Sequence, residues 1–84
     1  MNSKAAGSFW RTHANLPERI QDLAYKKYLL WLTNPFHPSL HFKRLKHGNW
    51  SVRVGDHYRA VGYFQDADTF VWTWIGTHEE YNKF

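Results

Sequence analysis

The sequence predicts an α+β domain in which two N-terminal helices pack on one face of a three- to four-stranded antiparallel sheet. Apolar residues recur at helical spacing up to about residue 34, and extended, alternating segments follow from residue 41. Very short turns join these extended segments, and strands joined so closely must be antiparallel. The 84 residues make one domain, with 5 Trp, 5 Tyr and 6 Phe to build an efficient core.

The N-terminal half predicts a short helix and then a longer one. Residues 1–7 are small and polar, and we expect them to be flexible. Residues 8–14 could form one or two helical turns. A longer helix is expected up to Asn34, with Asn15 as N-cap, Pro17 in the first turn and Glu18 in the capping-box position. Its apolar positions are Ile20, Leu23, Ala24, Tyr28 and Trp31.

Strands are predicted at residues 41–46, 50–54, 58–65 and 69–75, with a final helical turn in residues 79–84. The last strand is apolar throughout, as expected for a strand that is buried on both faces. In the second strand Val52 and Val54 should point toward the helices, while Ser51 and Arg53 point to the opposite face. That opposite face is left free for a ligand.

Positive charge is concentrated in the window from His41 to Arg59. The formal net charge of +4 lies entirely there, because the rest of the chain has equal numbers of acidic and basic residues. The window holds one acidic residue, Asp56, and the candidate nucleic-acid-binding residues Lys43, Arg44, Lys46, Arg53 and Arg59. Such a patch fits nucleic acid, an acidic protein segment or a membrane surface, and it also fits an ordinary solvated face.

Several classes of function are disfavoured. The chain has no Cys, which favours a reducing cytoplasm and removes thiolate catalysis. It shows no apolar run long enough for a membrane span and no signal peptide. His37 and His41 flank Pro38 without a carboxylate, so we expect no metal and no cofactor. Glycine-rich phosphate loops and nucleophile elbows are absent, and no Ser has an evident partner.

The remaining candidates for chemistry are Arg53, Arg59, His78 and Tyr81. Arg53 and Arg59 lie on neighbouring strands and could hold one phosphate together. His78 follows the most buried strand, and Tyr81 comes within its reach if a helical turn forms there. Each residue also has an ordinary structural explanation. Together they suit cleavage of RNA through its own 2′-hydroxyl, which needs only a base, an acid and cations around the phosphate.

Four stretches then resemble the RelE/ParE superfamily of toxins from bacterial toxin–antitoxin operons. They are residues 40–45 (LHFKRL), 50–55 (WSVRVG), 58–62 (YRAVG) and 74–81 (WIGTHEEY), and the resemblance runs from about Leu16 to Tyr81. It implies a cytoplasmic toxin, held inactive by a cognate antitoxin, that cuts mRNA without a metal, usually on the ribosome. It also implies an alternative function, since ParE-like members bind DNA gyrase instead. A third possibility is an inactive relative that binds only RNA or the antitoxin.

The resemblance implies that Arg59 holds the scissile phosphate and that His78 or Tyr81 moves protons. Two departures matter. Family members usually open with a β-strand, and residues 1–8 show no strand pattern, so we expect that strand to be missing. In addition, Ser51 stands at a strand position where the lysine-rich catalytic set of RelE can have Lys.

Overall fold

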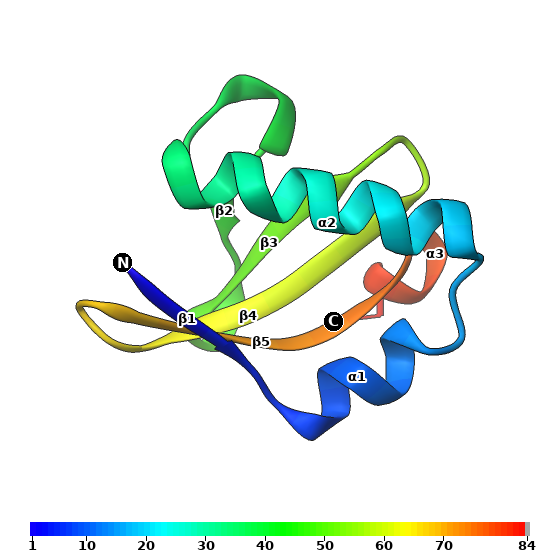
Figure 1. Ribbon diagram of the computed structural model, residues 1–84. Coiled ribbons are helices and arrows are strands. Elements are labelled where there is room, and N and C mark those ends of the chain that lie inside the picture. The colour runs from blue at the N-terminus through cyan, green and yellow to red at the C-terminus, as the bar shows by residue number, and fades with distance from the viewer. Residues whose placement is uncertain (84) are drawn as a thin grey trace.

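The computed structural model describes residues 1–83 and confirms the α+β class. The helices are α1 (Gly7–His13), α2 (Glu18–Thr33) and α3 (His78–Tyr81), with short 3-10 turns η1 (Pro38–Leu40) and η2 (Lys46–Gly48). The strands are β1 (Asn2–Ala5), β2 (Lys43–Arg44), β3 (Asn49–Val54), β4 (Tyr58–Asp66) and β5 (Thr69–Thr77). They form one sheet in the order β1-β5-β4-β3-β2, and α2 runs across one of its faces (Figure 1).

The expectation that the first strand is missing was wrong. Residues Asn2–Ala5 form β1, which pairs in parallel with the start of β5, so this segment is part of the sheet rather than a loose end. The tetrapeptide has no apolar alternation that would mark it as a strand. Its pairing is instead specified by main-chain contacts with a strand far along the chain, such as the bond from the Asn2 N–H to the Asp68 carbonyl (2.7 Å).

Two local expectations also need correction. Asn15 does not cap α2, because the helix begins at Glu18 with Pro17 at the N-cap, and within residues 1–83 this N-cap has no side-chain capping hydrogen bond. Asn15 instead belongs to the turn that closes α1, where its N–H donates to the Thr12 carbonyl. The strand expected over residues 41–46 is only two residues long. It begins late because His41 takes a left-handed conformation (φ 45°), and it ends before η2, which begins at Lys46.

Aromatic rings fill the core between α2 and the sheet. Trp31 of α2 is 1% exposed, and its ring meets those of Phe42, Phe70 and Trp72 at centroid distances of 5.9, 5.2 and 5.1 Å. Val52 and Val54 point into this core as predicted. None of the helices in residues 1–83 is both long and apolar enough for a bilayer crossing.

A bulge in β5 decides which of its side chains face the core. Val61 pairs with Trp74 and Gly62 with Trp72, so Thr73 is skipped in the register. Phe70 and Trp72 point to the helices before the bulge, whereas Trp74 lies opposite Val61 on the far face after it. The apolar residues of β5, which predict burial on both faces of the strand, therefore place aromatic rings on both faces of the sheet.

Candidate functional site

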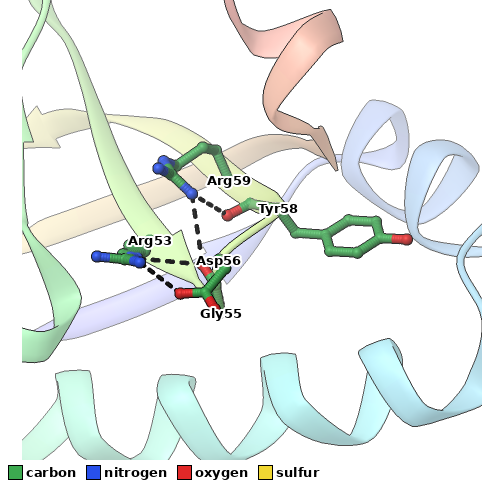
Figure 2. Close-up of polar contacts among 5 residues, drawn as sticks. All are labelled: Arg53, Gly55, Asp56, Tyr58 and Arg59. Carbon is green, nitrogen blue, oxygen red and sulfur yellow. Dashed lines mark hydrogen bonds and ion pairs between the residues drawn. The ribbon is translucent and has the colours of Figure 1, made fainter.

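The strand register places the two candidate arginines side by side. Arg53 of β3 and Arg59 of β4 are direct cross-strand partners, on the sheet face opposite α2. The β3–β4 turn between them depends on Gly55, whose φ of +67° favours glycine. Figure 2 shows both guanidinium groups extending to the same side of this turn. The prediction that they share one face is confirmed by this register.

Each guanidinium is held near the turn by oxygen acceptors. Arg53 donates to the Asp56 carboxylate (2.5 Å) and the Gly55 carbonyl (3.2 Å), and Arg59 donates to the Tyr58 carbonyl (2.8 Å; Figure 2). Partial burial lowers the pKa of Arg59 from its ordinary value, and the neighbouring charge of Arg53 lowers it further. Two cations held together in this way form a site that an anion would stabilise.

The helix α3 is built on a local sequence signal. Thr77-His78-Glu79-Glu80 reads as a capping box, in which the Thr77 hydroxyl accepts from the Glu80 N–H (3.2 Å) and Glu80 accepts from the Thr77 N–H (3.1 Å). These bonds from Thr77 keep the pKa of the Glu80 carboxyl below its ordinary value. The His78 N–H also donates to the His57 carbonyl (2.7 Å), which ties α3 to the β3–β4 turn.

Tyr81 of α3 reaches back over the arginine face. Its hydroxyl donates to Oγ of the buried Ser51 (3.2 Å), and its ring centroid lies 6.0 Å from the Arg59 guanidinium carbon. The His78 ring stacks on the Tyr81 ring with centroids 5.8 Å apart. Ser51 had no evident partner in the sequence, because this hydrogen bond joins residues 30 positions apart, which only the fold brings together.

Trp74 and Gly76 of β5 lie next to Arg59 on the same face of the sheet. Gly76 is the cross-strand partner of Arg59, and a Cβ at Gly76 would lie 2.4 Å from Cζ2 of the Trp74 ring. The indole therefore lies directly against the glycine backbone. Sequence reasoning did not identify Trp74 as part of the site, whereas Gly76, inside an apolar strand and next to His78, was already a signal of close approach.

The predicted nucleic-acid-binding set is only partly brought together. Lys43 pairs with Ser51 and so belongs to the same face as Arg53 and Arg59. Arg44 pairs with Trp50, whose ring packs in the core, so Arg44 projects toward the opposite face at the sheet edge. Lys46 lies in η2, outside the strands. The four predicted catalytic residues Arg53, Arg59, His78 and Tyr81, by contrast, form one cluster.

The described histidines outside this cluster are not arranged as metal ligands. His37 uses Nδ1 to accept from the Ser39 N–H (3.1 Å) at the start of η1, and His41 ends that turn. Within residues 1–83, no group of three His, Asp or Glu side chains is placed to hold a metal ion.

Residues 18–83 match the family model of the ParE-like toxin domain. The chain belongs to this ParE-like toxin family. No curated protein sequence matches it significantly.

Solved structures show how far the fold is shared. A YoeB/ParE toxin from Agrobacterium tumefaciens superposes with a TM-score of 0.71 at 18% identity, covering 93% of this chain and 99% of that one. YafQ from E. coli gives 0.72 at 17% identity, covering 95% and 96%. The RelBE2 toxin–antitoxin complex from Mycobacterium tuberculosis gives 0.68 at 20% identity, covering 92% and 96%. The expected RelE/ParE-like fold is confirmed.

Proposed function

We propose that this ParE-like chain is the toxin of a toxin–antitoxin pair and that it cleaves mRNA without a metal. The observation that carries the proposal is the clustering of Arg53, Arg59, His78 and Tyr81 on one sheet face, although they come from three elements. Structures of toxin–antitoxin complexes that share this fold support the antitoxin partner.

The proposed reaction uses the substrate's own nucleophile. The 2′-hydroxyl loses its proton and attacks the adjacent phosphorus, the bond from phosphorus to the 5′ oxygen breaks, and a 2′,3′-cyclic phosphate and a 5′-hydroxyl result. The two guanidinium groups stabilise the added negative charge on the pentacoordinate phosphate. Imidazole can exchange protons near neutral pH, so the His78 ring accepts the 2′-hydroxyl proton and the Tyr81 phenol donates one to the leaving 5′ oxygen.

Binding of a phosphate requires one rearrangement in this cluster. The Asp56 carboxylate occupies Arg53 in the structure, and its side chain is 80% exposed, so it can swing away at low cost. Among residues 1–83, the partners of Arg59 are backbone carbonyls and the Tyr81 ring, so it meets an incoming phosphate without losing an ion pair. Arg59 is therefore the primary phosphate ligand, and Arg53 joins it afterwards.

The test is cleavage of a single-stranded RNA, with and without ribosomes, by the wild type and by Arg59→Ala, His78→Ala and Tyr81→Phe variants. Losing one of these groups should slow cleavage about 100-fold or more. Tyr81→Phe keeps the ring against Arg59 and removes only the phenolic hydroxyl, together with its bond to Ser51. Equal cleavage by all four folded proteins would contradict the assignment of these residues.

The match to the ParE-like family favours a second candidate, gyrase inhibition. A gyrase inhibitor needs surface contacts and no proton transfer, so His78→Ala and Tyr81→Phe should keep full toxicity. Supercoiling by purified gyrase should then fall in the presence of this chain, while RNA stays intact. Normal supercoiling at high concentration of the chain would remove this candidate.

A further inference from the structure

A buried hydroxyl lies on the arginine face of the sheet. Ser51 of β3 comes two residues before Arg53 and therefore points to the same face. Among residues 1–83 it is the one buried polar residue, with 2% of its surface exposed. Its cross-strand neighbours are Lys43 on β2 and Val61 on β4, and Val61 is fully buried. Burying a hydroxyl is unfavourable unless it is hydrogen-bonded, so packing alone would favour an apolar residue at this position.

The Ser51 hydroxyl is bonded to the residue that we propose as the proton donor. Ser51 Oγ lies 3.2 Å from the Tyr81 hydroxyl, and this bond links β3 to α3. The main chain of α3 is fixed at its start, where the His78 N–H donates to the His57 carbonyl, whereas Tyr81 is the last residue of this four-residue helix. The bond to Ser51 fixes the far end of the Tyr81 ring beside Arg59. A group that transfers a proton has to be held to within about 0.5 Å of its productive position, and this bond supplies that restraint.

A serine hydroxyl can also follow the change of charge during proton transfer. It has one donor and two acceptor sites, and rotation of the O–H bond selects which of them is used. In the structure Tyr81 donates and Ser51 accepts. Once the phenol proton has moved to the leaving 5′ oxygen, the phenolate is an acceptor, and the Ser51 O–H can turn and donate to it. A hydrogen bond to a charged group favours the charged form, so this rotation stabilises the phenolate.

We propose that Ser51 is a positioning residue for RNA cleavage, which holds the Tyr81 hydroxyl at the leaving 5′ oxygen and stabilises the phenolate formed there. The inference rests on the proposed function. The bond from phosphorus to the 5′ oxygen breaks as the Tyr81 proton moves to that oxygen, and Ser51 keeps its own proton throughout. The proton that His78 took from the 2′-hydroxyl then returns through water to the phenolate, so both groups are restored and no proton is gained or lost.

The test compares two RNA substrates with different leaving groups. In one the leaving atom is the ordinary 5′ oxygen, and in the other a bridging sulfur replaces it. Because a thiol is a far stronger acid than an alcohol, a thiolate leaves without help from a proton donor. In single-turnover assays, Ser51→Ala should slow cleavage of the oxygen substrate about tenfold or more, as for loss of a hydrogen bond to a charged group. It should cleave the sulfur substrate within about twofold of the wild-type rate.

A merely structural role would slow both substrates by the same factor, and that result would overturn the proposal. Ser8→Ala is the matched control, because the Ser8 hydroxyl also makes one bond between elements, from α1 to the Thr73 carbonyl of β5 (2.7 Å), outside the arginine cluster. It should cleave both substrates like the wild type. The same selective loss in Ser8→Ala would show that the effect does not come from the bond to Tyr81.

A double-mutant cycle tests whether Ser51 acts through Tyr81. Adding Ser51→Ala to Tyr81→Phe should slow cleavage of the oxygen substrate no further, since the bond between the two residues is already lost. Effects that multiply would mean that Ser51 acts independently, contrary to the proposal.

Two further outcomes separate the possible failures. If urea titration shows that Ser51→Ala is unfolded, Ser51→Cys makes the same comparison, because it keeps a side chain of similar shape and replaces the hydroxyl with a weakly hydrogen-bonding thiol. No cleavage of either substrate by the wild type would overturn the proposed reaction and the role of Ser51 with it. Cleavage of the oxygen substrate that Tyr81→Phe slows and Ser51→Ala does not would overturn the role of Ser51 alone.

Discussion

The pairing of Arg53 with Arg59 predicts that Arg59→Met removes RNA cleavage without weakening the fold. Met keeps an unbranched apolar stem of similar length and loses the charge. Two like charges directly opposite each other on antiparallel strands cost about 0.2 to 1 kcal/mol. Their effect is visible in the lowered pKa of Arg59, to which burial contributes first and Arg53 second.

The substitution also removes contacts of Arg59 that stabilise the folded state. Its bond to the Tyr58 carbonyl (2.8 Å) and its place over the Tyr81 ring (6.0 Å) are both partly exposed, and together contribute about 1 kcal/mol. Repulsion and contacts therefore offset each other. We expect the free energy of unfolding of Arg59→Met to lie within about 1 kcal/mol of the wild type. Cleavage should nevertheless fall about 100-fold or more.

The assay combines urea unfolding with single-turnover RNA cleavage, each at low and at high salt. Salt screens the Arg53–Arg59 repulsion, so the wild type should gain stability with salt relative to Arg59→Met. If the free energy of unfolding of Arg59→Met is lower than that of the wild type by more than about 2 kcal/mol, Arg59 has a structural role. Cleavage that stays near the wild-type rate would refute its role at the phosphate.

Three more outcomes follow from the same geometry. Gly76→Ala should destabilise the fold by about 1 to 3 kcal/mol in a urea titration, because its Cβ would lie 2.4 Å from the Trp74 ring; a change near zero would mean that the indole moves freely. Asp56→Asn should tighten binding of a short RNA by up to about fivefold at low salt, since it frees Arg53, and fluorescence anisotropy that shows weaker binding would contradict this. The lowered pKa of Glu80 means that the capping box stabilises α3 above the ordinary pKa of 4.5 and that this stability is lost as pH falls through the lower folded value. NMR signals of the α3 backbone amides should show α3 fraying there, whereas Glu80→Gln should show no such transition.

Local patterns were enough to predict the elements that carry strong periodicity. The α2 helix follows from its apolar spacing and from Pro35 beyond its end, and β3, β4 and β5 follow from alternation and turn residues. β1 was missed because the four residues of Asn2–Ala5 have no pattern of their own, and their partner strand lies almost at the other end of the chain. The capping box of α3 could have been predicted from the spacing of Thr77 and Glu80, but it was not.

The candidate site likewise has features that local sequence predicts and features that depend on the fold. By itself the sequence determined that Arg53 and Arg59 flank one tight turn, because alternation and turn length are local properties. It also supplied His78 and Tyr81 at the end of a buried strand. Only the tertiary structure decided that Tyr81 bonds Ser51 and that Arg44 leaves the arginine face. These features depend on strand order, register and the β5 bulge, which arise from contacts between segments far apart in the chain.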